Sequence, residues 1–201
     1  MEDVSRPQKD TDIVVQTYLT PEQVTLMREK LAENFETAVG VTARHLALEV
    51  WVYGMLSLST MARASAVSSI KWDQIDLEGR VINDVVEKEG YIVSLYFSNE
   101  VKELLEKLKA FRSEMQIEDN GLLFVTKSGG ITDASVMFLW ARIIGNLIGV
   151  STLHPHDFRH SGATLLKNLG MELEDISKLL NHKGLDVTQK HYIKVDPKML
   201  Q

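Results

Sequence analysis

The densest group of side chains able to do chemistry is the segment His154-Pro155-His156-Asp157-Phe158-Arg159-His160. Three histidines and one aspartate within seven residues first suggest a metal site. The spacing argues against zinc, because the aspartate directly follows His156 and a zinc site needs further ligands with supporting residues around them. A phosphatase or metal hydrolase that uses this cluster therefore stays as an outlying alternative, and the sequence predicts no metal and no cofactor.

Helix geometry offers a second interpretation of the same segment. Pro155 suits the start of a helix, and His156 and Arg159 then project three residues apart from one face of the first turn. That turn also has unpaired N–H groups and the positive end of the helix dipole. An imidazole and a guanidinium beside such a helix end can form a phosphate-binding corner. Taken alone, this pattern is explained more readily by a surface helix with incidental polar residues.

Further motifs extend the pattern over most of the chain, and their order and intervals resemble those of the tyrosine recombinase (phage integrase) family. The resemblance covers residues 18–196. The matching motifs are, in chain order, Thr60-Met61-Ala62-Arg63-Ala64-Ser65-Ala66, Ile70-Lys71-Trp72-Asp73-Gln74-Ile75-Asp76, Lys88, His156-Asp157-Phe158-Arg159-His160, Leu180-Asn181-His182 and Tyr192.

The resemblance implies a site-specific DNA recombinase or integrase that cleaves and rejoins DNA through a 3′-phosphotyrosyl intermediate, without metal or ATP. Tyr192 would be the nucleophile, Lys88 the general acid and His156 the general base, while two arginines and His182 would stabilise the transition state. The implied catalytic residues are Arg63, Lys88, His156, Arg159, His182 and Tyr192.

Each implied residue also has a structural interpretation that the sequence leaves open. Arg63 could be a surface cation and Lys88 a charge in a hairpin turn. His182 could cap the C-terminus of the preceding helix. Tyr192 could be packed in the core, with its neighbour His191 as the functional group.

Three positions depart from the family pattern. Met61 and Asn181 stand where the family usually has glycine, and Ala66 stands where it usually has a carboxylate that helps to hold the active-site arginines. The missing carboxylate and the acidic composition favour one alternative, a recombinase-fold DNA-binding regulator with impaired catalysis. A type IB topoisomerase-like enzyme is a second alternative, because it shares the nucleophile and the arginines.

The composition is that of an ordinary globular domain, with 44% hydrophobic and 25% charged residues and no cysteine. We find neither a secretory signal nor an apolar run of the ~20 residues that a membrane span needs, so we expect a cytoplasmic protein, nucleoid-associated when bound to DNA. The net charge of −6 is uneven, at −7 for residues 1–100 and +1 for residues 101–201. A local basic cleft is therefore compatible with the acidic total.

These residues require a scaffold, and hydrophobic periodicity predicts an α+β, mostly α, domain with a small antiparallel sheet of about three strands. Residues 1–17 form a polar lead-in or linker, and residues 18–201 form the catalytic domain. A capping box at Thr20 and Gln23 opens the first helix, which places Val24, Met27, Leu31 and Phe35 on one face. We expect further helices over 43–59, 63–69, 99–114, 133–145, 156–169, 172–181 and 186–193, and strands over 70–76, 80–87, 91–97 and 122–125.

The resemblance also implies partners. It predicts binding to a double-stranded DNA recombination site, as a tetramer on DNA or a monomer when the domain is isolated, in a phage or mobile element. The family has a DNA-clamping domain before the catalytic domain, and the match begins at Tyr18. This start favours an excised catalytic fragment over a naturally short protein.

Overall fold

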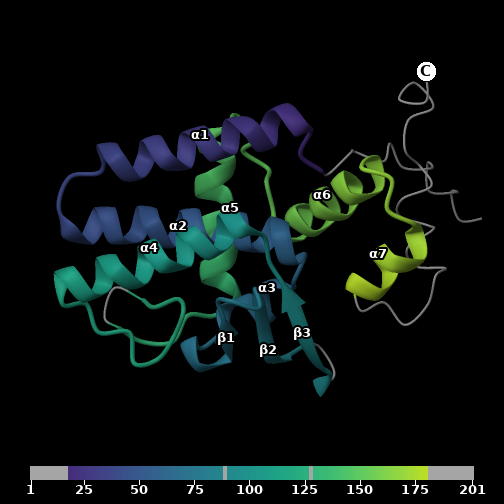
Figure 1. Cartoon of the computed structure of the whole chain (residues 1–201). Helices are drawn as coiled ribbons and strands as arrows, with labels where there is room; N and C mark the ends of the chain where they lie inside the picture. The colour runs from purple at the N-terminus through teal and green to yellow at the C-terminus, as the bar shows by residue number, and fades with distance from the viewer. Residues whose placement is uncertain (1–17, 88–89, 127–128, 181–201) are drawn as a thin grey trace, which may run out of the picture.

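The computed structural model describes residues 18–87, 90–126 and 129–180. The described chain is mostly helical, with one three-stranded antiparallel sheet of order β1-β2-β3, which confirms the predicted fold class (Figure 1). Its elements are α1 (Pro21–Thr37), α2 (Val41–Thr60), α3 (Ala64–Ser68), the 3₁₀ turn η1 (Trp72–Gln74), β1 (Ile75–Asp76), β2 (Val81–Val86), β3 (Ile92–Tyr96), α4 (Asn99–Met115), α5 (Ala134–Leu147), α6 (Pro155–Asn168) and α7 (Leu173–Leu179).

Helix α2 is the centre of the fold, because α1, α4, α5 and α6 all pack against it (Figure 1). Its 20 residues are apolar on most sides, as a helix surrounded by protein must be. None of the helices in the described part of the chain is long and apolar enough to cross a membrane.

Helix α1 follows the sequence prediction closely. The Thr20 hydroxyl accepts a hydrogen bond from the Gln23 amide at 3.2 Å, and the Gln23 side chain accepts one from the Thr20 amide at 2.9 Å. This capping box satisfies two amides that a helix start leaves unpaired. The four predicted core residues are all buried: Val24, Met27, Leu31 and Phe35.

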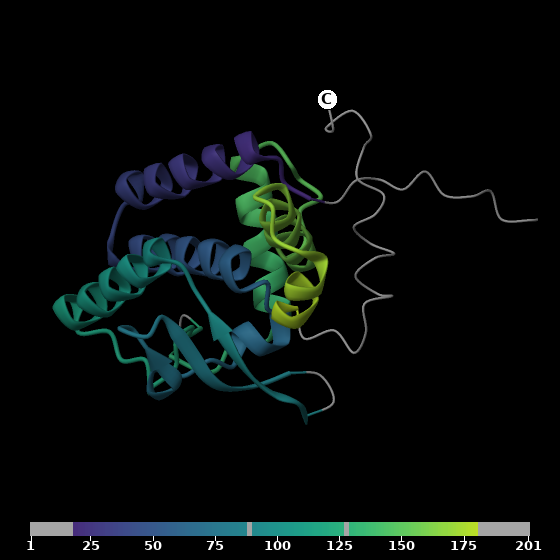
Figure 2. The same ribbon diagram turned by 45° about the vertical axis from the view of Figure 1, so that its right-hand side comes forward.

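The sheet lies beside the helices, and the hairpin formed by two of its strands, β2 and β3, extends away from them (Figure 2). Strands β2 and β3 match the predicted hairpin, but the predicted strand over 70–76 is largely wrong. Only Ile75 and Asp76 pair with β2. Residues Trp72–Gln74 turn instead, and the Trp72 indole donates to the Asp119 carboxylate at 2.9 Å. Trp72 and Asp119 are 47 positions apart, so a local sequence pattern cannot predict this bond.

The predicted strand over 122–125 is also wrong, since this segment makes isolated bridges only, Lys71 with Leu122 and Val125 with Ile131. Side chains take the place of a neighbouring strand. The Arg112 guanidinium donates to the carbonyl oxygens of Leu122 at 3.1 Å and Leu123 at 3.0 Å.

A buried polar group, here called the Arg112 cluster, holds that segment against the helices. Arg112 donates to Glu49 at 2.7 Å, to Asp119 at 3.1 Å and to the His45 ring at 3.0 Å. Glu49 also accepts from the Val125 amide at 2.9 Å. Burial raises the pKa of Glu49 to about 7, against the lowering effects of this amide and of Arg112.

The C-terminal helices match the prediction where the structure describes them. Asp133 caps α5 by accepting from the amides of Ser135 and Val136, and α6 begins at Pro155. Gly170 follows α6 with a φ of 90°, a conformation that favours glycine. The predicted helix over 186–193 lies outside the described residues.

Candidate active site

Arg63 lies where α2 gives way to the short helix α3. Met61 ends α2 in the left-handed conformation, with a φ of 55°, and the chain turns there. Arg63 is the N-cap residue of α3. The Arg63 side chain is 33% exposed, and its Nη1 group forms an ion pair with the carboxylate of Glu87, which is 3% exposed. The guanidinium is therefore held by the protein through Nη1, while about a third of the Arg63 side chain stays exposed.

Arg159 is almost fully buried on α6, at 3% exposure. Its Nη1 group donates to the carbonyl oxygen of Met61 at 2.7 Å, and its Nη2 group donates to the carbonyl oxygen of Leu180. These acceptors are the C-terminal ends of α2 and α7. Arg159 therefore fixes three helices relative to one another, and its acceptor Met61 lies two residues before Arg63 in the chain.

A glycine permits this close approach of α6 to α2. A Cβ atom added to Gly162 would lie 2.4 Å from the Leu58 carbonyl oxygen and 2.6 Å from Cγ of Met61. Neither distance is compatible with a side chain, so the helices can pack in this way only with glycine at position 162.

His156 occupies the first turn of α6 and is exposed. Its ring lies edge-to-face against the His160 ring, with centroids 4.6 Å apart. Arg159 is buried instead, so the two residues predicted to share one face differ in their environments. Within residues 18–87, 90–126 and 129–180, no three His, Asp or Glu side chains gather in a way that could hold a metal ion.

Lys88, His182 and Tyr192 lie outside the described residues. The described neighbours of two of them contact the arginines. Glu87, which precedes Lys88, pairs with Arg63, and Leu180, two residues before His182, accepts from Arg159. Arg159 thus contacts the end of α2 two residues before Arg63, and we call this meeting of α2, α3 and α6 the arginine junction. The chain continues from Glu87 to Lys88 and from Leu180 towards His182.

Glu87 is a site residue that the sequence did not predict. The available signal was one acidic residue, Glu87, directly after the apolar residues Val85 and Val86. In a strand with regular alternation, Glu87 and the buried Ile82 would lie on opposite faces, with Glu87 in solvent. The pattern therefore gave no reason to expect a buried carboxylate.

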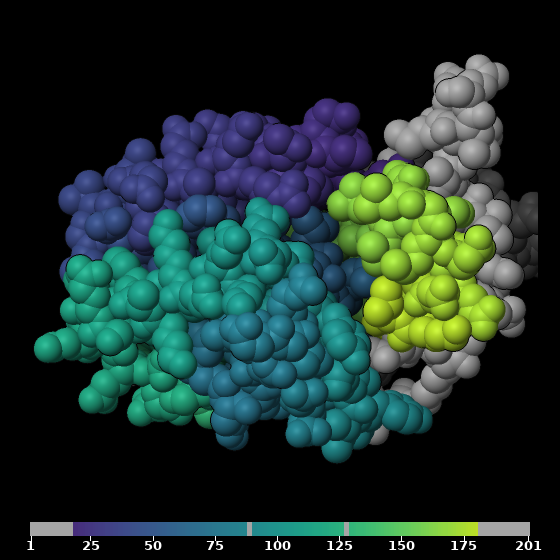
Figure 3. Space-filling model, viewed as in Figure 1, coloured from purple at the N-terminus to yellow at the C-terminus, as the bar shows by residue number. Residues whose placement is uncertain are grey.

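A groove of about 440 Å³ lies near this junction, between β3 and α7 (Figure 3). Met61, Tyr96 and Lys178 contribute to its lining. The Lys178 ammonium already lies 3.1 Å from Asp175 and 3.5 Å from Glu174, so its charge is balanced. The groove therefore resembles a phosphate site less than the arginine junction does.

The junction contains two guanidinium groups, a type of group that suits the binding of phosphate oxygens. Guanidinium groups bind phosphate oxygens through paired hydrogen bonds, and a partly exposed Arg63 can offer such donors to a ligand. The backbone contacts of Arg159 restrict its rotamers, so its charge is fixed before any ligand arrives.

Comparison with known proteins identifies the family of this chain. The model of the phage integrase family matches residues 18–199. The tyrosine recombinase XerC of Staphylococcus saprophyticus is 29% identical over 137 residues, which cover 68% of this chain and 46% of that protein. XerC of Staphylococcus aureus strain JH9 is 29% identical over 166 residues, or 81% of this chain and 54% of that protein. The chain thus spans about half the length of these relatives.

Solved structures share the fold at low identity. The XerA recombinase superposes with a TM-score of 0.72 at 20% identity, over 97% of this chain and 64% of that chain. The post-cleavage complex of the XerH site-specific recombinase with a palindromic difH substrate gives a TM-score of 0.74 at 20% identity, over 92% of this chain and 51% of that chain. The chain therefore belongs to the phage integrase family and has the fold of a tyrosine recombinase.

Proposed function

We propose that this chain is the catalytic domain of a site-specific DNA recombinase that cuts and rejoins duplex DNA through a 3′-phosphotyrosyl intermediate. Membership of the phage integrase family and the junction of Arg63 and Arg159 support the proposal. The observation that carries it is the bond from Arg159 to the Met61 carbonyl, since it ties Arg159 to the chain two residues before Arg63, and we propose that both arginines bind the scissile phosphate.

The proposed reaction is an exchange of esters. The Tyr192 oxygen attacks the scissile phosphorus and its proton passes to His156, while the bond from phosphorus to the 5′-oxygen breaks and that oxygen takes a proton from Lys88. The products are a 3′-phosphotyrosine and a free 5′-hydroxyl. A 5′-hydroxyl from the partner strand reverses the step, so one phosphodiester is exchanged for another without ATP or metal.

Arg63, Arg159 and His182 would stabilise the extra negative charge on the non-bridging oxygens. A preorganised donor of this kind contributes about 2.7–4 kcal/mol to transition-state stabilisation. Three donors can therefore account for a large part of the rate enhancement.

The partner proposed here is a duplex recombination site, bound by four copies of the protein across two duplexes. Such a protein would act in the cytoplasm, at the nucleoid. The mass of the protein–DNA assembly, measured by analytical ultracentrifugation, tests the tetramer.

The experiment uses a pool of duplexes with a randomised core and one nick, so that cleavage beside the nick releases a short oligonucleotide and traps the adduct. We expect a covalent protein–DNA species in a denaturing gel that persists in EDTA and disappears in Tyr192→Phe. Tyr96→Phe, which alters an exposed tyrosine of β3, is the matched control and should retain the adduct.

Other outcomes identify the alternatives. Binding to the pool without an adduct would overturn the proposal and favour a DNA-binding regulator. An adduct that relaxes supercoiled DNA without strand exchange would favour a type IB topoisomerase-like enzyme. An adduct abolished by EDTA would contradict the metal-independent mechanism.

A further inference from the structure

Glu87 is a buried carboxylate that the reaction described above does not use. Its side chain is 3% exposed at the end of β2, and Oε2 pairs with Nη1 of Arg63, 24 positions earlier in the chain. Its other oxygen, Oε1, is buried and accepts no hydrogen bond from the described part of the chain. A carboxylate is expensive to bury, so a paired one beside a partly exposed arginine calls for an explanation.

An irregularity in β2 turns Glu87 inward. Ile82 pairs with Leu95 and Val85 with Val93, so β2 has one more residue than β3 between these two pairs. One extra residue reverses which face the following side chains occupy. The bulge therefore places Glu87 on the inner face with Ile82 and Val85, both buried, whereas regular alternation would place it in solvent.

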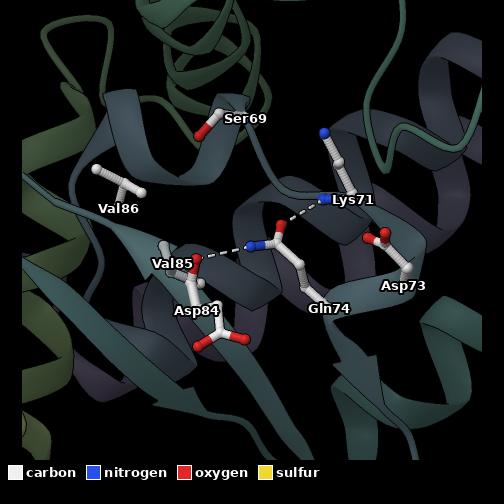
Figure 4. Close-up of a pocket in the computed structure, with 7 residues that line it drawn as sticks. All are labelled: Ser69, Lys71, Asp73, Gln74, Asp84, Val85 and Val86. Carbon is white, nitrogen blue, oxygen red and sulfur yellow. Dashed lines mark hydrogen bonds between the residues drawn. The ribbon is translucent and has the colours of Figure 1, made fainter.

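The side chain of Gln74 stabilises this bulge. Its Nε2 group donates to the carbonyl oxygen of Asn83 at 3.2 Å. Figure 4 shows its two other bonds, from Nε2 to the Asp84 carbonyl oxygen at 2.9 Å and from the Lys71 amide to Oε1 at 2.8 Å. Asp84 has a φ of 53°, in the left-handed region, where aspartate is found more often than most residues other than glycine. The bulge is thus held by specific contacts, and with it the direction of Glu87.

Pairing with Glu87 restricts the Arg63 side chain. A guanidinium on a flexible stem has many rotamers in solvent, and a charge-assisted bond to a fixed carboxylate selects among them. The neighbouring helix α3 supplies no carboxylate for this purpose, because its buried face has Ala66, which is 0% exposed.

We propose that Glu87 is a positioning residue that holds the Arg63 guanidinium in its reactive orientation. The inference rests on the proposed function, since Arg63 is taken to contact the scissile phosphate. Glu87 touches neither DNA nor the reacting atoms; it acts through Arg63. It also replaces, from a different element, the carboxylate absent at position 66.

The test compares Glu87→Gln with wild type. Gln keeps the shape of the side chain and removes its charge. We expect adduct formation at saturating protein to slow about 10- to 100-fold. We also expect DNA affinity and the melting temperature to change little. Glu100→Gln is the matched control, because Glu100 forms an exposed ion pair with Arg28 at 2.9 Å, and it should react at the wild-type rate.

A double-mutant cycle identifies the residue through which Glu87 acts. In an Arg63→Ala background, Glu87→Gln should slow adduct formation no further. It should also raise the melting temperature of Arg63→Ala, because it removes a buried carboxylate that has lost its partner. Equal slowing in both backgrounds would overturn the proposal, and so would a Glu87→Gln rate at or above that of wild type.

A measurement that needs no activity separates this proposal from the proposed function. Nitrogen-15 NMR of the free protein should show slow rotation of the Arg63 guanidinium in wild type and fast rotation in Glu87→Gln. Fast rotation in wild type would overturn the positioning role. If wild type shows slow rotation but forms no adduct, the recombinase proposal fails while the Glu87–Arg63 pairing stands.

Discussion

The Nη1 group of Arg159 donates a 2.7 Å hydrogen bond to the carbonyl oxygen of Met61, across 98 positions of sequence. Met61 lies two residues before Arg63, so the position of α6 sets the separation of the two arginines. Any change that displaces α6 from the end of α2 should therefore disturb both residues together.

Gly162→Ala tests this dependence. The added Cβ would lie 2.4 Å from the Leu58 carbonyl oxygen, and because backbone cannot move aside cheaply, the helices must separate. We expect the free energy of unfolding to fall by about 1–3 kcal/mol, as for other overpacked sites. Adduct formation should slow in parallel. Urea denaturation and the trapped-adduct assay measure the two effects.

Asn168→Ala is the control for Gly162→Ala, because Asn168 is exposed at the end of the same helix. Its free energy of unfolding should stay within about 0.5 kcal/mol of wild type. Wild-type stability in Gly162→Ala would show that α6 does not pack on α2 as described.

Met61→Gly sets two effects against each other. Met61 has a φ of 55°, and removing the side chain relieves a left-handed strain of about 1–2 kcal/mol. The side chain is also buried in a cluster with Ala163, Ile176 and Leu180, and such truncations cost about 2–5 kcal/mol. We therefore expect a net loss of stability in urea denaturation, even though glycine suits the backbone better.

Gln116→Gly is the matched control for Met61→Gly. Gln116 also ends a helix, α4, with a φ of 53°, but its side chain is exposed. Only the strain is removed there, so stability should rise by about 1 kcal/mol. If both variants gain stability, burial of Met61 is not the dominant effect.

Local patterns predicted the helices well and the irregular segments poorly. The capping box at Thr20 and the apolar spacing of α1 act within one helix, so the sequence displays them directly. The segment before β1 follows instead from a bond between Trp72 and Asp119, which are distant in sequence. Such partners appear only once the chain has folded.

The candidate site shows the same division. The order of the motifs indicated Arg63 and Arg159, and the structure places them at one junction. Their fixed orientations depend on a backbone carbonyl and on Glu87, which a one-residue bulge turns inward. Neither a carbonyl acceptor nor a bulge has a sequence signature of its own, so these contacts could not be predicted.

Arg112→Leu should destabilise the fold strongly. Arg112 and Glu49 are both 3% exposed, and removing the guanidinium leaves the Glu49 carboxylate buried without its ion pair. Breaking such a pair costs about 3–5 kcal/mol. The carbonyl oxygens of Leu122 and Leu123 also lose their donors. Urea denaturation at neutral pH measures the loss.

Arg142→Leu provides the comparison, because it is the same substitution at an exposed position of α5. Its stability should stay within about 0.5 kcal/mol of wild type. Equal losses in both variants would mean that the Arg112 cluster contributes nothing specific to stability.

His45 should make stability depend on pH. Burial, together with the charge of Arg112, lowers the pKa of His45 to about 4 from 6.5, against the raising effect of Asp119. Its Nε2 atom accepts the bond from Arg112 Nε, which requires that nitrogen to be unprotonated. The unfolded chain takes up a proton below pH 6.5 and the folded protein only near pH 4. Stability from His45 is therefore complete above pH 6.5 and is lost as the pH falls towards 4.

His45→Gln isolates this contribution, since Gln can accept the same hydrogen bond but does not titrate. Unfolding is measured from pH 8 to pH 4, and the difference at pH 8, where His45 is neutral in both states, is subtracted as a constant. Wild type should then lose stability relative to the variant by up to about 1.4 kcal/mol per pH unit below pH 6.5. Glu49, whose pKa of about 7 acts in the opposite direction, is present in both proteins and largely cancels in this difference. Parallel pH profiles would contradict the lowered pKa of His45.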